Sequence, residues 1–148
     1  MKVQCQCGAV AFETKSSKPL SVYCCHCTEC QRQSSSAFGT SAIFPANELF
    51  PLTDDLRGKL GMWSRGADSG NTVDCYFCKA CGARVVHRNI GKDGIERPVM
   101  SVKGGLVEGL DWSEAVHIFT ASAVVAIPEG VKAYEKEPPE MIGKKAED

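Results

Sequence analysis

Residues 5–8 are Cys5-Gln6-Cys7-Gly8, and residues 78–82 are Cys78-Lys79-Ala80-Cys81-Gly82. Alternate residues of a strand share a face, so the first pair can offer both sulfurs to one ion. In the second pair, two intervening residues allow a tight turn that brings the sulfurs together, and the glycine that follows tolerates the positive φ of such a turn. Together the two pairs predict a four-sulfur zinc site that fastens the start of the chain to its middle.

A third cluster occupies residues 24–30, Cys24-Cys25-His26-Cys27-Thr28-Glu29-Cys30. On a strand, Cys25 and Cys27 share a face and Cys24 points the other way. Zinc takes four protein ligands when it is structural and three plus an exchangeable group when it is catalytic. The simplest partition of the motif cysteines is a closed site of Cys5, Cys7, Cys78 and Cys81 and an open site of Cys25, Cys27 and Cys30.

A second partition stays open at this point. Cys24 or Cys75 could act as a fourth ligand to the third cluster, which would give two closed structural sites and no chemistry. If neither does so, we expect both to be small buried residues.

Composition excludes several classes of protein. The chain has 148 residues, with 17 Lys and Arg against 18 Asp and Glu, so no basic field favours nucleic acid as a partner. No apolar stretch approaches the roughly 18 residues of a membrane span, so no membrane partner is expected. No secretory signal opens the sequence, so we expect a cytoplasmic protein. In a reducing compartment, an odd set of nine cysteines favours metal binding over disulfides.

Short β-type runs between glycine-containing breaks predict a mainly β domain with a few short helices. The expected strands are residues 10–14, 20–24, 37–44, 59–64, 73–77, 84–87, 99–103 and 116–120, and the expected helices are 28–33 and 46–50. We expect one domain over residues 1–134. The prolines and charges of residues 135–148 predict a solvated C-terminal tail.

Four elements carry a resemblance to a known family: Cys5-x-Cys7-Gly8-Ala9-Val10-x-Phe12, Cys25-His26-Cys27-x-x-Cys30-Gln31-Arg32, Phe77-Cys78-x-x-Cys81-Gly82 and His117-Ile118-Phe119. In these the sequence resembles the glutathione-dependent formaldehyde-activating enzyme family, which includes the centromere protein V group. The resemblance implies a zinc-pinned β fold of the type shared with a Rab exchange factor (Mss-like). It also implies the same four-plus-three division of the zinc ligands.

The sequence departs from the family pattern at two places. Ser35 stands where the family commonly has glycine, and the tryptophan that often follows the His-Ile-aromatic strand is absent from residues 122–127. The geometry beside the open zinc and one wall of its pocket are therefore expected to differ here.

The expected chemistry follows from charge. Three thiolates on Zn²⁺ sum to −1, so a water molecule on this ion would be polarised weakly, and a fourth sulfur suits the soft site better. Zinc would hold an incoming thiol as thiolate near neutral pH. With the resemblance, this predicts two zinc ions per chain and a carbon–sulfur lyase type of enzyme. It would act on glutathione or another small thiol or its adduct, for example forming S-hydroxymethylglutathione from formaldehyde.

An alternative function is a non-catalytic zinc module for protein or cytoskeletal binding, which the centromere protein V group permits. A metal-storage role is a weaker third possibility. The fourth coordination position of the second zinc distinguishes the enzyme from the binding module. An enzyme leaves that position open, and a binding module can close it.

Several other side chains are candidates for the site. Arg32 could hold a substrate carboxylate or offset the negative zinc site, and Arg65 and Lys103 are weaker candidates for the same role. Glu29 is a candidate base, although a solvated turn residue is expected. We expect structural hydrogen bonds or core positions for His26, His87 and His117, and packing roles for Trp63 and Trp112.

Overall fold

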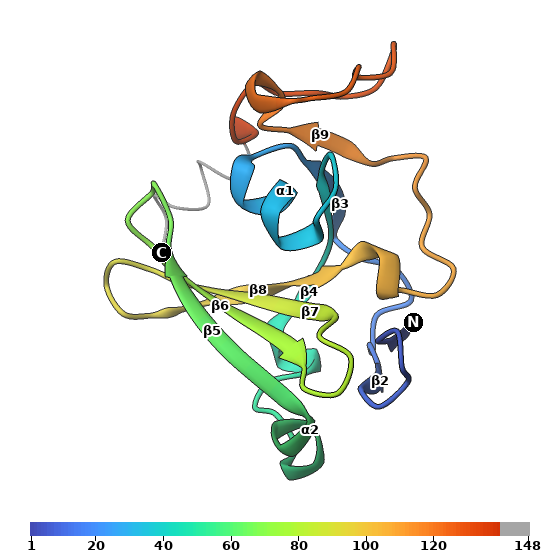
Figure 1. Ribbon diagram of the computed structural model, residues 1–148, viewed down its shortest axis with the longest axis vertical. Coiled ribbons are helices and arrows are strands. Elements are labelled where there is room, and N and C mark those ends of the chain that lie inside the picture. The colour runs from blue at the N-terminus through green and yellow to red at the C-terminus, as the bar shows by residue number, and fades with distance from the viewer. Residues whose placement is uncertain (140–148) are drawn as a thin grey trace. The chain divides into compact units, whose positions relative to one another are not determined.

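The structure is a computed structural model, and it describes residues 1–139. The chain forms two compact units. Of the described residues, unit 1 consists of 1–20 and 42–110, and unit 2 consists of 21–41 and 111–139. Within β4 (Gly39–Pro45) the chain passes from unit 2 into unit 1. Figure 1 shows the elements in chain order.

Unit 1 is built on an antiparallel meander of four strands, β5 (Leu60–Gly66), β6 (Thr72–Cys78), β7 (Arg84–Ile90) and β8 (Glu96–Lys103), which are the long green and yellow ribbons of Figure 1. Side chains directly opposite in antiparallel strands point to the same face. The register therefore forms one transverse row of four residues, which are Trp63, Cys75, His87 and Ser101.

Strands β6, β7 and β8 of the meander bury apolar side chains in a core. The fully buried core residues of unit 1 include Val3, Val10, Phe44, Val85, Val86, Met100 and Val102. Phe44 comes from β4, which lies next to β8 in the sheet order. The 3-10 turns η1 (Ala46–Glu48) and η2 (Gly104–Leu106) follow β4 and β8.

A hairpin of β1 (Lys2–Gln4) and β2 (Ala11–Glu13) begins unit 1. Val3 also forms an isolated antiparallel bridge with Val107, and the Glu108 N–H donates to the carbonyl of Lys2 at 2.9 Å. The start of the chain is thus held against a segment a hundred residues later. The loop of this hairpin carries the first cysteine pair.

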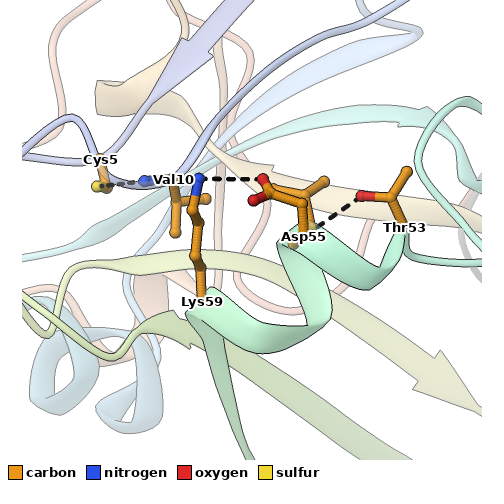
Figure 2. A network of polar contacts seen from close by, with 6 residues as sticks. Cys5, Val10, Thr53, Asp55 and Lys59 are labelled. Carbon is orange, nitrogen blue, oxygen red and sulfur yellow. Dashed lines mark hydrogen bonds and ion pairs between the residues drawn. The ribbon is translucent and has the colours of Figure 1, made fainter.

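Helix α2 (Asp54–Lys59) is short and is stabilised mainly at its ends. The Thr53 hydroxyl caps it by accepting from the Leu56 N–H at 3.3 Å, and Lys59 pairs with Asp55 at 3.0 Å, as Figure 2 shows. Acidic residues in the first turn and basic residues in the last turn complement the helix dipole.

Unit 2 has a parallel pair of strands, β3 (Ser21–Cys25) and β9 (Val116–Ile118), in which Cys24 lies opposite His117. The chain leaves β3 through a two-residue corner into α1 (Thr28–Ser34). Cys27 caps the N-terminus of α1, and Ser35 follows its C-terminus with φ of 51°, in the left-handed region. The 3-10 turn η3 (Thr120–Ser122) comes after β9.

The predicted mainly β fold with few short helices is confirmed, and the helices expected at 28–33 and 46–50 are observed as α1 and η1. The strand β1 and the helix α2 were not predicted, because each is too short to show a periodic apolar pattern. None of the helices in residues 1–139 has the length and apolar character of a membrane span.

The expectation of a solvated tail is wrong at one point, since Pro138 is fully buried. A proline ring has no backbone N–H to leave unpaired, so it can be buried at little polar cost. The rest of the predicted tail, residues 140–148, lies outside the described residues.

Candidate metal centres

The first cysteine cluster lies in unit 1. Cys5 and Cys7 come from the β1–β2 loop, Cys78 ends β6, and Cys81 lies in the turn before β7. The sulfurs all lie within 4.8 Å of one another, with Cys5 Sγ 3.6 Å from Cys7 Sγ and Cys7 Sγ 3.8 Å from Cys78 Sγ. Tetrahedral zinc with bonds near 2.3 Å places its sulfurs roughly 3.8 Å apart. The four side chains therefore fit a zinc ion.

Backbone hydrogen bonds shape both halves of this cluster. The Val10 N–H donates to Cys5 Sγ at 3.3 Å, as Figure 2 shows. Gly8 and Gly82 adopt φ of 80° and 77°, and their N–H groups bond back to the carbonyls of Cys5 and Cys78. The predicted turn geometry at both glycines is confirmed, since a side chain at positive φ would be strained.

The electrostatics of the first cluster favour thiolates at two of its members. Hydrogen bonds from the backbone N–H groups of Ala83 and Cys7 lower the pKa of Cys81 to about 6. Burial works against ionisation of Cys5, but the Val10 N–H and the neighbouring thiols hold its pKa below the ordinary value. Thiolates are the form that binds zinc.

The second cluster lies in unit 2, at the corner between β3 and α1. Cys25 is the last residue of β3, Cys27 is the N-cap of α1, and Cys30 lies in its first turn. Cys25 Sγ is 3.5 Å from Cys27 Sγ, and the three sulfurs lie within 4.8 Å of one another. Cys25 is buried and the other two are half-buried. This spacing also matches sulfurs that share one zinc ion.

The corner itself is fixed by backbone bonds. The Cys30 N–H donates to Cys27 Sγ at 3.4 Å, and the His26 N–H donates to the carbonyl of Ile118 at 2.9 Å. The Gln31 side chain donates to the carbonyl of His26 at 2.7 Å. The three sulfurs are therefore brought together by the local fold of unit 2.

In this cluster the thiolate form is favoured at Cys27 over Cys25. Hydrogen bonds from the Cys25 and Cys30 thiols, with the Cys30 N–H, lower the pKa of Cys27. The hydrogen bonds it shares with the same neighbours, together with burial, raise the pKa of Cys25. A divalent cation bound between these sulfurs would stabilise their thiolate forms together.

Within residues 1–139 this group contains three ligand side chains. Cys24 and Cys75 do not belong to it. Both are buried, as predicted, and burial raises the pKa of each thiol.

The three histidines occupy structural positions, as predicted. His26 is fully buried, and its Nε2 lies 2.9 Å from Nδ1 of His117, with the two rings stacked at 5.2 Å. Burial, with the charge of His117, lowers the pKa of His26. In unit 1, buried His87 accepts a hydrogen bond at Nε2 from Arg84 at 3.0 Å.

The other candidate side chains lie on several different elements. Glu29 and Arg32 lie on α1 and approach each other to 3.9 Å, and the Arg32 side chain is 76% exposed. Arg65 and Lys103 lie in unit 1, on β5 and β8. The packing roles expected for the tryptophans are wrong, since Trp63 and Trp112 are 53% and 44% exposed.

Sequence reasoning missed Arg84, which contacts both His87 and Trp63. In a regular strand, residues 84 and 87 would face opposite sides. An irregularity in the β6–β7 register opposite Tyr76 and Phe77 brings them together. The sequence carries no clear signal for such a bulge.

Comparison with known proteins places this arrangement in a family. The sequence model of the glutathione-dependent formaldehyde-activating enzymes matches residues 1–122, a range that holds both cysteine clusters. No curated protein matches the chain. The match extends over most of the sequence, and the chain belongs to the glutathione-dependent formaldehyde-activating enzyme family.

Proposed function

We propose that this protein is a zinc-dependent enzyme that makes or breaks a carbon–sulfur bond in glutathione or a glutathione adduct. One such reaction is the formation of S-hydroxymethylglutathione from glutathione and formaldehyde. The observation that carries the proposal is the group of three sulfurs at the β3–α1 corner, in a chain of this family. A three-ligand zinc site leaves a position for a substrate. A cytoplasmic location and a domain over residues 1–134 belong to the same proposal.

Two zinc ions per chain are proposed. Cys5, Cys7, Cys78 and Cys81 would hold the structural ion, and Cys25, Cys27 and Cys30 would hold the functional one. When bound, the functional ion would keep an incoming thiol in its reactive thiolate form near neutral pH.

The chain's own residues would hold this site in shape. The Sγ atom of Cys27 accepts a hydrogen bond from the Cys30 N–H. This bond orients the sulfur and favours its thiolate form. His26 anchors the corner through its backbone bond to Ile118 and its ring contact with His117. Such preorganisation lowers the reorganisation needed when substrate arrives.

The proposed reaction balances without a redox partner. The glutathione sulfur attacks the carbon of formaldehyde and forms the carbon–sulfur bond, and the carbonyl electron pair moves to oxygen, which takes up a proton. In the reverse direction the hydroxyl loses its proton, the carbonyl forms again and the sulfur leaves as thiolate.

The alternative of a non-catalytic binding module has one observation in its favour. Among the described residues of unit 2, the exposed large apolar side chains are Trp112, Val124 and Val125. Exposed apolar residues can serve a protein partner.

The test combines native mass spectrometry with exchange NMR. We expect two zinc ions in the wild-type chain, and faster interconversion of ¹³C-formaldehyde and S-hydroxymethylglutathione than in buffer. Because the uncatalysed addition is fast, the exchange rate must be measured and not the yield.

Cys30→Ser and Cys24→Ala are the matched variants. Cys30→Ser should keep one zinc and lose the acceleration, while Cys24→Ala, a cysteine beside the cluster, should keep both. Two zinc ions with no effect of the protein on the exchange rate would contradict the enzyme and favour the binding module.

A further inference from the structure

The side chain of Gln31 joins two separate segments of unit 2. Its Nε2 donates to the carbonyl of His26 at 2.7 Å and to the carbonyl of Ser122 at 3.0 Å. An amide nitrogen carries two hydrogens, so one side chain supplies both bonds. Because both acceptors are carbonyl oxygens, only the nitrogen of the amide can face them. Gln31 therefore links the corner between β3 and α1 to the turn η3.

At the corner, Gln31 holds two consecutive carbonyl groups of the ligand segment. Its side chain binds the carbonyl of His26, and its backbone N–H donates to the carbonyl of Cys27 at 3.0 Å. His26 lies between Cys25 and Cys27 in the chain and is fully buried. A buried carbonyl without a partner is costly. Loss of the Gln31 amide would therefore leave a carbonyl between two candidate ligands without its donor.

Turn η3, the other segment that Gln31 holds, begins with a strained residue. Phe119 has φ of 56° and ψ of 39°, in the left-handed region, which is rare for a bulky aromatic residue. Its N–H donates to the carbonyl of Lys136 at 3.2 Å, and the Thr120 N–H donates to the carbonyl of Tyr134 at 3.1 Å. Such strain persists where the surrounding structure holds it, and it is frequent at functional sites. Gln31 adds a further bond at the end of the same turn.

The strained turn starts beside the second cysteine cluster. In the parallel pair of β3 and β9, Cys25 lies opposite Ile118, the residue before Phe119. The His26 N–H donates to the carbonyl of Ile118 at 2.9 Å. His26 is thus held at its N–H by β9 and at its carbonyl by the Gln31 amide.

We propose that Gln31 is a positioning residue of the second metal centre. Its amide fixes the His26 carbonyl and η3 together, so that the sulfurs of Cys25 and Cys27 keep their separation of 3.5 Å before a metal binds. Residues that support metal ligands in this way set the orientation of those ligands, and their loss commonly lowers metal affinity by roughly 10- to 100-fold. The inference rests on the proposed functional zinc, and it does not depend on the reaction that this zinc serves.

The test measures the second metal site separately from the first. Gln31→Met keeps the length and helix preference of the side chain but has no N–H to donate. Competition with a chromophoric chelator, read as zinc retained per chain, should show the second zinc bound roughly tenfold or more weakly than in the wild type.

A spectroscopic measurement reports on the geometry of each site. With ¹¹³Cd in place of zinc, NMR should give one resonance for each site, and Cys30→Ser, which should lack one of them, assigns the three-sulfur site. We expect Gln31→Met to shift or broaden the resonance of the three-sulfur site. The resonance of the four-sulfur site should be unchanged, which also shows that the variant is folded.

Gln33→Met is the matched control. Gln33 lies two residues farther along the same helix, is half-buried like Gln31, and donates no side-chain hydrogen bond within residues 1–139. It should match the wild type in both measurements, whereas a general weakening of α1 would appear in both variants. Gln31→Lys restores N–H donors on a longer stem and should recover part of the zinc affinity, and Gln33→Lys controls for the added charge.

Three results would overturn the positioning role. They are wild-type behaviour of Gln31→Met in both measurements, an equal change in Gln33→Met, and the absence of a second bound metal in the wild type.

The result is separable from the proposed function. If the protein does not accelerate formaldehyde exchange while Gln31→Met still alters the second site, the positioning role stands and the enzyme proposal fails. If the exchange is accelerated and Gln31→Met behaves as the wild type does, the positioning role fails alone.

Discussion

In this protein, burial and neighbouring charges set the protonation state of single residues. His87 would be an ordinary titrating histidine in an unfolded chain, with a pKa near 6.5. In the folded chain, burial and the neighbouring cations Lys103, Arg84 and Arg65 lower its pKa, and the buried Cys75 thiol contributes no charge. The neutral ring can then accept a hydrogen bond from Arg84.

The first prediction concerns stability against pH. Below about pH 6.5 His87 is protonated in the unfolded chain but stays neutral in the folded chain. The free energy of unfolding therefore falls as the pH falls. Between pH 7.5 and 5.5 the wild type should lose about 1 kcal/mol more than His87→Gln. Urea unfolding at both pH values checks this, and equal losses in the two proteins would contradict it.

At the scale of the element, α1 depends on the residues that follow it. Ser35 ends the helix at φ of 51°, where its N–H bonds to the carbonyls of Arg32 and Gln31. A residue with a side chain is strained in this region, and glycine is the usual occupant. The departure from the family pattern at Ser35 therefore keeps the backbone geometry of glycine.

The second prediction is that Ser35→Gly stabilises the chain. Relief of left-handed strain exceeds the added entropy of the unfolded state, with a net gain of about 0.5 kcal/mol. Thermal unfolding measures the gain. Ser35→Ala, which removes the hydroxyl but keeps the strained Cβ, is the control and should give no increase in midpoint.

Gly39 gives the third prediction. A Cβ at Gly39 would lie 3.0 Å from the Cβ of Cys30 and 2.9 Å from Nε2 of Gln33, so in Gly39→Ala the Gln33 side chain must turn away and Cys30 must shift slightly. Displacement of Cys30 should lower the affinity of the second zinc by roughly tenfold or more, as displaced ligands and their supports commonly do. The first zinc should be unaffected.

Competition with a chromophoric chelator, read as zinc released per chain, measures this effect. Gly105→Ala is a matched control, because nothing lies within 4 Å of a Cβ built there. Equal release from Gly39→Ala and wild type would show that α1 tolerates the added methyl group.

At the scale of the whole molecule, the first cluster joins parts of the chain that are far apart. Cys7 and Cys78 are separated by 71 residues, and their sulfurs lie 3.8 Å apart. A metal ion that closes so long a loop removes much of the freedom of the unfolded chain. The second cluster closes only the short corner of residues 25–30.

The fourth prediction follows from this difference. Cys78→Ser should lower the free energy of unfolding by more than about 3 kcal/mol, whereas Cys30→Ser should cost clearly less, because one mutation opens a long loop and the other a short one. Urea unfolding of the zinc-loaded proteins compares them. A larger loss in Cys30→Ser would reverse the proposed structural and functional roles.

The sequence by itself determined the mainly β class, the two cysteine groups and the turns at Gly8 and Gly82. Ligand spacing, turn glycines and short apolar runs are local features. Each depends only on residues that are close together in the sequence. The four-plus-three grouping of the cysteines could be inferred in this way, because metal ligands come in recognisable pairs.

Tertiary structure alone decided how distant side chains meet. His26 and His117 are 91 residues apart, and their contact depends on the parallel register of β3 and β9. The contact of Arg84 with His87 depends on the register of β6 and β7 and on the bulge that turns Arg84 toward His87. Register and burial are set by the packing of the whole sheet, so no short stretch of sequence contains them.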